Sequence, residues 1–223
     1  MTYAEALGLQ RALAQRRVDH DIDQDLLLLV EHNPVVTLGR GAKDTSMPFP
    51  AQALAARGVE VFEVEHGGDV TFHGPGQLVG YPIFDLTEHK PDLHWFLRRL
   101  EAALITALGE LGIPAERNEG LTGVWTGGRK IASLGIHVKQ WVTWHGFALN
   151  VTTDLSYFDL IVPCGISGVE MTSVQKELNE RTPRDVWNRS LDSVILGFAE
   201  AFDQQPQALT LDTLSPVPSP AHY

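Results

Sequence analysis

The sequence contains a single cysteine, Cys164, among its 223 residues. One thiol cannot close an internal disulfide, which favours a reducing compartment, so we expect a cytoplasmic protein. No stretch approaches the roughly 18 consecutive apolar residues that a membrane span needs. The first residues also lack the basic and apolar segments of a secretion signal, so we expect no membrane association.

Basic side chains are scarce. Lysine and arginine total 17 against 28 aspartates and glutamates, for a formal net charge of −11. Binding to nucleic acid needs a basic face to neutralise phosphates, so this balance argues against nucleic acid as the main partner.

The periodicity of the chain predicts an α+β fold. With 43% hydrophobic and 20% charged residues, the composition is that of an ordinary globular protein, and the length suits one large domain. We expect helices over 2–17, 50–57, 92–111 and from 182, and strands over 26–32, 35–38, 59–65, 78–86, 121–126, 130–138 and 141–151.

Two of these strands carry further expectations. The apolar run at 26–32 predicts a strand buried on both faces. Pro82 interrupts the strand at 78–86, so this strand should be an edge or contain a bulge. The four prolines after Gln204 indicate a loosely packed tail, which we place at 206–223, after a single domain at 1–205.

Lys130 stands at an unusual position, directly after a predicted hairpin turn and at the start of an apolar strand. Gly127 and Gly128 tolerate the positive φ of such a turn, and Ile131 begins the buried strand. A lysine that points inward there is a candidate base, because burial favours its neutral form. The alternative is a solvated lysine that ends the turn.

Cys164 lies between Pro163 and Gly165, in a segment that could present a side chain instead of packing it. A neighbouring positive charge would stabilise the thiolate, which is the attacking form. The alternative is an inert buried thiol, which is common for free cysteine.

Four histidines, His66, His73, His137 and His145, lie on elements that could converge. A cysteine–histidine pair is the commoner way to activate a thiol, so His73 rivals Lys130 as the partner of Cys164. The spacings of cysteine and histidine match no zinc motif, so we expect no metal.

The glycines at 67, 68, 74 and 76 allow a ligand to approach the backbone closely, or they serve as hairpin turns. Their spacing fits neither the phosphate-binding loop of nucleotide-binding proteins nor the dinucleotide fingerprint. A nucleotide site is therefore poorly supported.

Several ordered blocks resemble the octanoyltransferases of lipoate biosynthesis. The run GGDVTFHGPGQLVGYP at 67–82 resembles their signature. Further blocks follow in the family's order, and the resemblance covers about residues 25–180: LLVEHNPV at 28–35, TLGR at 37–40, GVW at 123–125, RKIASLGI at 129–136, GFALNV at 146–151 and PCGI at 163–166.

The resemblance implies the catalytic-domain fold of biotin and lipoate ligases, with an acyl-thioester forming on Cys164. Lys130 would lower the pKa of that thiol and transfer protons. This chain has His66 where the family usually has arginine, so a fixed cation is in doubt there. The implied substrate-binding residues are His66, Gly67, Gly68, Asp69, Val70, Thr71, Phe72, His73, Ser133, Leu134, Gly135, Gly146, Phe147 and Ala148.

The resemblance also implies the substrates. Octanoyl acyl carrier protein would be the donor, and the acceptors would be the lipoyl domains of 2-oxoacid dehydrogenase complexes and the glycine cleavage H protein. No cofactor is implied, because the thioester already carries the activation. An ATP-dependent lipoate or biotin ligase on the same fold is the nearest rival, and a non-catalytic acyl-binding protein is the second.

Overall fold

The computed structural model describes residues 1–162, 168–179, 183–210 and Leu214. Its elements are α1 (Tyr3–Val18), β1 (Leu26–Val30), β2 (Val35–Leu38), η1 (Asp44–Ser46), α2 (Ala51–Ala55), β3 (Glu60–Glu63), β4 (Val70–His73), β5 (Gln77–Ile83), η2 (Leu86–Glu88), α3 (Leu93–Glu110), β6 (Glu116–Asn118), β7 (Leu121–Thr126), β8 (Arg129–Lys139), β9 (Val142–Asn150), η3 (Leu155–Leu160), α4 (Val174–Leu178) and α5 (Pro183–Phe202).

The strands form two sheets. The larger has six strands in the order β1-β5-β9-β8-β7-β6, and every neighbouring pair is antiparallel. The smaller has the order β3-β2-β4, in which β2 is parallel to β3 and antiparallel to β4. Helices and largely antiparallel strands together confirm the α+β class.

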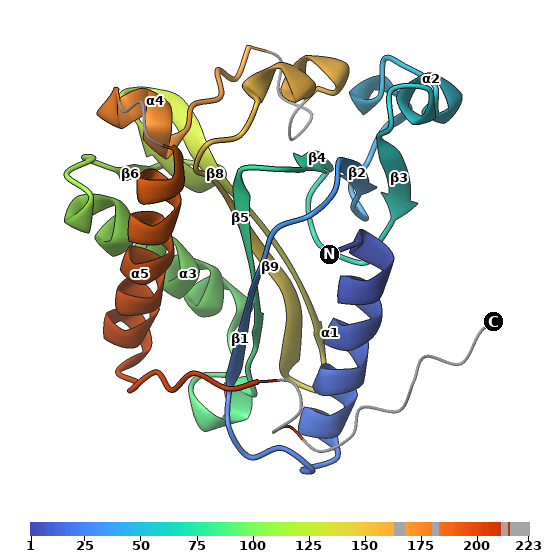
Figure 1. Ribbon diagram of the computed structural model, residues 1–223. Helices are drawn as coiled ribbons and strands as arrows, with labels where there is room; N and C mark the ends of the chain where they lie inside the picture. Colours follow the sequence, from blue (N-terminus) through green and yellow to red (C-terminus); the bar gives the residue numbers. More distant parts are fainter. Residues whose placement is uncertain (163–167, 180–182, 211–213, 215–223) are drawn as a thin grey trace.

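Helices cover both faces of the large sheet: α3 and α5 lie on one face and α1 on the other (Figure 1). Side chains of β9 alternate between these layers. Phe147 and Leu149 belong to the main core with α3 and α5, while Ala148 packs with Ala6 of α1. The small sheet lies beside the N-terminal end of α1 (Figure 1). The face of the large sheet that packs against α1 also lines a cavity together with the small sheet.

Local signals in the sequence set several element boundaries. Thr2 and Glu5 form a reciprocal capping box at the start of α1, and Asp92 caps α3 by accepting a hydrogen bond from the Trp95 N–H at 3.0 Å. Gly127 and Gly128 have φ of 52° and 77° and connect β7 to β8 as a two-residue turn. The expected hairpin turn before Lys130 is confirmed.

Two expectations about strands need correction. The strand over 26–32 is not buried on both faces, because β1 is an edge of the large sheet and most of it is half-buried. Pro82 does not mark an edge, because β5 is a buried interior strand between β1 and β9. The pairing of β5 with β9 stops at Gly80, before Pro82, so the missing N–H of the proline interrupts no bond of that ladder.

Beyond residue 210 the structure describes one residue of the tail, Leu214. Leu214 is buried and packs with Leu13 and Ala14 of α1, and its carbonyl accepts a hydrogen bond from Arg16 Nη1 at 2.8 Å. In the part of the chain that the structure describes, no helix combines the length and apolar character required to cross a membrane.

At Gly197, where α5 crosses α3, we predict that any side chain lowers the stability of the protein. A Cβ there would lie 2.1 Å from the Ala103 carbonyl oxygen, which is backbone and cannot rotate away. We expect Gly197→Ala to lower the free energy of unfolding by about 1–3 kcal/mol through overpacking. Urea unfolding measures this change.

Gly109→Ala is the matched control, since a Cβ at this position of α3 would meet no atom within 4 Å. It should stabilise the protein by about 0.5–1 kcal/mol through helix propensity. Equal effects of the two substitutions would contradict the close crossing.

Candidate functional site

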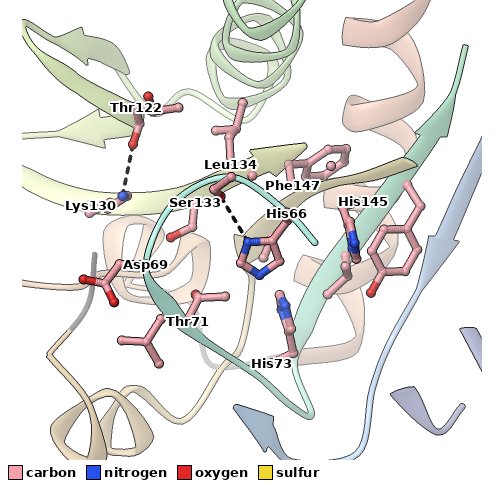
Figure 2. Close-up of a pocket in the computed structure, with 18 of the residues that line it drawn as sticks. His66, Asp69, Thr71, His73, Thr122, Lys130, Ser133, Leu134, His145 and Phe147 are labelled. Atoms are coloured by element: carbon pink, nitrogen blue, oxygen red, sulfur yellow. Dashed lines mark hydrogen bonds between the residues drawn. The ribbon is translucent and has the colours of Figure 1, made fainter. Parts of the chain in front are cut away.

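A cavity of about 230 Å³ lies between the large sheet and the segment that leads into β4. Residues from both sheets, from α1 and from the loop before β7 line it (Figure 2). The lining residues are Tyr3, His66–Thr71, His73, Val79, Tyr81, Gly120–Thr122, Lys130, Ser133–Gly135 and His145–Ala148.

The Gly-rich segment at 66–69 is held between two backbones. The Gly67 N–H donates to the Ile136 carbonyl of β8 at 2.9 Å, and the Gly41 N–H donates to the Gly68 carbonyl at 2.8 Å. A Cβ at Gly135 would lie 2.8 Å from the Gly67 carbonyl oxygen, and a Cβ at Gly39 would lie 2.6 Å from that of Gly68. Side chains at 39 and 135 would therefore push this wall of the cavity away.

Short residues also form the floor. Ser133 of β8 pairs with Ala148 of β9, and Gly135 pairs with Gly146. Because these four positions lie opposite one another on adjacent strands, their small side chains leave space above the sheet. A narrow, extended ligand suits this space better than a bulky one.

Lys130 lies at one end of the cavity and is only 2% exposed. Its Nζ donates to the Thr122 carbonyl oxygen at 3.1 Å and lies 5.6 Å from the centroid of the Trp125 ring. Its backbone pairs with the segment after residue 167: the Lys130 N–H donates to the Glu170 carbonyl, and its carbonyl accepts from the Thr172 N–H. The inward-pointing alternative for Lys130 is confirmed.

A buried carboxylate supports β7, the strand whose Thr122 carbonyl binds the Lys130 amine. Glu101 Oε1 accepts the Gly123 N–H at 3.2 Å, while Oε2 accepts from Arg98 Nη1 at 2.6 Å and from Arg117 Nε at 2.9 Å. Gly123 has a φ of 141°, and a Cβ there would lie 2.7 Å from Lys130 Cε. Glu101 thus fixes the backbone next to the Thr122 carbonyl that binds the amine.

Asp69 contributes a carboxylate to the cavity wall. Its Oδ2 accepts a hydrogen bond from the Ser46 hydroxyl at 2.8 Å. The Ser46 carbonyl in turn accepts the Val162 N–H at 2.9 Å. Val162 is the last described residue before the segment 163–167, which contains Cys164. Cys164 itself lies outside the described residues.

Three of the four candidate histidines, His66, His73 and His145, line the cavity. The rings of His66 and His145 meet edge to face, with centroids 5.3 Å apart. His137 does not line it and packs against Trp144 instead, with ring centroids 4.2 Å apart. Within the described residues, no group of three or more histidine, cysteine, aspartate or glutamate side chains is arranged to hold a metal ion.

Burial keeps these cavity histidines neutral. It lowers the pKa of His73 to about 3, and of His145 to about 3, and it lowers the pKa of His66 as well. Gln77 fixes the tautomer of His73, because its Nε2 donates to Phe72 and Asn150 oxygens and leaves Oε1 to accept from His73 Nδ1 at 2.8 Å. His73 therefore cannot supply the positive charge that would stabilise a thiolate near neutral pH.

Comparisons with known proteins agree with this geometry. Residues 2–195 match the model of the lipoyl protein ligase A/B catalytic domain. The chain belongs to that family. A Koribacter versatilis protein named octanoyltransferase is 55% identical over 183 residues, covering 80% of this chain and 72% of the relative. A Synechococcus elongatus octanoyltransferase is 46% identical over 215 residues, covering 96% and 89%.

Solved structures share the fold of this family member. A lipoate-bound putative lipoate protein ligase of T. acidophilum superposes with a TM-score of 0.73, covering 94% of this chain and 86% of that chain, at 16% identity. A lipoate-protein ligase A bound with ATP also has a TM-score of 0.73, covering 93% and 85%, at 16% identity. The expected ligase-like fold is confirmed.

The predicted substrate-binding residues converge on the cavity with one exception, Phe72. Its ring packs away from the cavity against Tyr157, with centroids 4.6 Å apart, because neighbouring strand residues face opposite sides. The sequence reasoning missed several lining residues. The alternation of β5 could have indicated Val79 and Tyr81, but no sequence signal brings Tyr3 of α1 or the Thr122 carbonyl to this place.

The buried neutral state of His73 predicts a pH-dependent stability. Its folded pKa of about 3 lies below the ordinary value of about 6.5, so the unfolded chain binds the proton first as the pH falls. Stability present above about pH 6.5 is therefore lost on acidification, by about 2 kcal/mol from His73 between pH 7 and pH 5. We expect His73→Asn to reduce the fall in unfolding free energy over this range by that amount.

Denaturant unfolding at the two pH values measures the difference. His94→Asn is the control, because His94 is exposed on α3 and away from the cavity. Parallel pH profiles for wild type and His73→Asn would show that His73 is not buried as a neutral ring.

Proposed function

We propose that this chain is an octanoyltransferase that moves an octanoyl group from octanoyl acyl carrier protein to the ε-amine of a lysine on a lipoyl domain. Its acceptors would be the lipoyl domains of 2-oxoacid dehydrogenase complexes and the glycine cleavage H protein, in the cytoplasm. Residues 1–205 would form the catalytic domain. Relatives at 46–55% identity carry the name octanoyltransferase, which supports this assignment.

One observation carries the chemical part of the proposal: a lysine buried at the end of a narrow cavity, whose backbone pairs with Glu170 and Thr172, a few residues after Cys164 in the chain. Val162 is tied to Ser46 on the Asp69 side, and Glu170 and Thr172 are tied to the Lys130 backbone. The described residues on both sides of 163–167 are thus connected by hydrogen bonds to the cavity residues Asp69 and Lys130, through Ser46 in the case of Val162. This arrangement supports Cys164 as the nucleophile and Lys130 as its partner.

In the first step, the Cys164 thiolate attacks the carbonyl carbon of the donor thioester. The bond between that carbon and the sulfur of the donor arm breaks, and the leaving sulfur receives a proton from Lys130. The octanoyl group is then held as a thioester on Cys164. No external energy is needed, because one thioester replaces another.

In the second step, the neutral amine of the acceptor lysine attacks the same carbonyl. The new carbon–nitrogen bond replaces the bond to Cys164, and the nitrogen's surplus proton passes to the neutral amine of Lys130. Cys164 leaves as a thiolate, which restores the starting state. Because the product is an amide, this step runs downhill from the thioester.

The cavity floor suits an octanoyl chain. Burying six methylenes at about 0.8 kcal/mol each contributes roughly 5 kcal/mol to acyl binding. The small residues Ser133, Gly135, Gly146 and Ala148 leave room for such a chain over the sheet. Water excluded from this space would also protect the thioester from hydrolysis.

An ATP-dependent ligase on the same fold remains the rival function, since ligases share the architecture. The glycines of the segment 67–76 do not have the spacing of a phosphate-binding loop, and a ligase needs no cysteine nucleophile. Transfer in the absence of ATP separates the two functions.

Octanoyl acyl carrier protein alone should leave one octanoyl group on the wild-type enzyme, visible as an added octanoyl mass by intact-mass spectrometry. Neutral hydroxylamine should remove it, as expected for a thioester. Cys164→Ala should show no adduct and no transfer to a lipoyl domain, because the nucleophile is lost. An adduct on a lysine, or ATP-dependent transfer, would refute the mechanism.

Lys130→Met should raise the pH at which Cys164 reacts with iodoacetamide, because the charge that stabilises the thiolate is gone. Methionine matches the length of the lysine and keeps its apolar contacts. His73→Asn should leave this pH profile unchanged, since His73 is neutral. The opposite pattern would identify a cysteine–histidine pair as the active one.

A further inference from the structure

One oxygen of the Asp69 carboxylate has no hydrogen-bond partner in the part of the chain that the structure describes. Oδ2 accepts from Ser46, but Oδ1 is buried and has no hydrogen-bond partner among the described residues. The backbone of Asp69 is held by the Gly39 N–H, which donates to the Asp69 carbonyl at 2.9 Å, and Ser46 orients the side chain. A buried carboxylate oxygen without a hydrogen-bond donor costs free energy of folding, so we look for a ligand that supplies the donor.

The residues around Asp69 indicate which kind of ligand would bind Oδ1. Asp69 is the one acidic side chain among the described residues that line the cavity. The three cavity histidines are neutral, and each has at least one ring nitrogen hydrogen-bonded to the protein, His66 through both. Lys130 carries an amine at the same cavity. A donor with positive charge is the ligand that a carboxylate attracts most strongly.

Only one of the two substrates brings such a group. The reacting centre of the donor is a neutral thioester, whereas the ε-amine of a free lysine is protonated near neutral pH, with an ordinary pKa of about 10.4. Lys130 is a neutral amine once the first step is complete, so it offers no opposite charge to the incoming ammonium. The Asp69 carboxylate does.

We propose that Asp69 binds the ε-ammonium group of the acceptor lysine and positions it for attack on the acyl-enzyme. The assignment rests on the proposed function. It separates the two steps of that reaction, because Asp69 acts in the second step and not in the first. Figure 2 shows Asp69 and Lys130 toward the same end of the cavity, opposite His145.

The proton balance assigns each group its part. The bound ammonium releases one proton to water and becomes the nucleophile. After attack, the second proton passes from the nitrogen to the neutral amine of Lys130, and Cys164 leaves as a thiolate. Asp69 returns unchanged, so it binds and orients the acceptor without keeping a proton.

Asp69→Asn tests this role, because the amide oxygen retains the acceptor for Ser46 while the charge is removed. With donor alone, the rate of acyl-enzyme formation should equal that of wild type. In a single turnover with a lipoyl domain, transfer should slow by about 10- to 100-fold, the range for losing a charge-assisted hydrogen bond. Discharge by hydroxylamine, which is largely uncharged near neutral pH, should not change.

Two further variants complete the experiment. Glu63→Gln removes one negative charge from exposed β3, outside the cavity, and should leave both half-reactions unchanged. Asp69→Glu keeps the charge and should recover part of the lost transfer rate. If Asp69→Asn does not fold, Asp69→Glu alone tests the inference. Relative to wild type, Asp69→Glu should transfer the octanoyl group to the lipoyl domain more slowly, while hydroxylamine should discharge both proteins at the same rate.

The outcomes are distinguishable. Equal losses in both half-reactions, an equal loss with hydroxylamine, or no loss at all would overturn the role of Asp69 while leaving the acyl-enzyme mechanism standing. Absence of an acyl-enzyme in wild type would instead refute the proposed function, and the assignment of Asp69 with it.

Discussion

The cavity depends on the close contact between the Gly-rich segment and the sheet beneath it. Gly67 donates to Ile136 of β8, and Gly135 and Gly39 permit backbone approaches that no Cβ would allow. Because backbone atoms fix this wall, the side chains that follow along it project from a rigid base. The positions of Asp69, Thr71 and His73 therefore depend on Gly39 and Gly135, which have no Cβ and let the backbones approach.

Burial then decides which groups in the cavity carry charge. It keeps His73 and His145 neutral by lowering the pKa of each to about 3, so histidine supplies polarity without charge. Lys130 and Asp69 are the lining residues left with ionisable amine and carboxylate groups. Charge interactions are stronger where water is excluded, so these two residues dominate the electrostatics that a substrate meets. A fixed cation at position 66 is not required for this arrangement, since His66 forms hydrogen bonds with Thr37 and Gly67.

Much of the fold and of the site could be predicted wherever the cause is local. The turn at Gly127 and Gly128 set the register that points Lys130 inward, and strand alternation should have excluded Phe72 from the cavity. Which histidines would reach the cavity was harder to predict, because an imidazole ring is polar and aromatic and can pack on either face of a strand. His137 accordingly packs on Trp144, while His145, on the paired strand, reaches the cavity through a backbone with φ of 57°.

The sequence by itself determined the helix caps, the hairpin turn, the class of fold and the order of motifs, because each depends on residues close together in the chain. Only the tertiary structure decided that Tyr3, Thr122 and Asp69 share a cavity, and that Glu101 of α3 supports the backbone beside Lys130. It also placed β5 inside the sheet despite Pro82, since pairing with β9 ends before the proline. Such contacts join segments far apart in the sequence, and their register follows from the packing of whole layers, which no local pattern specifies.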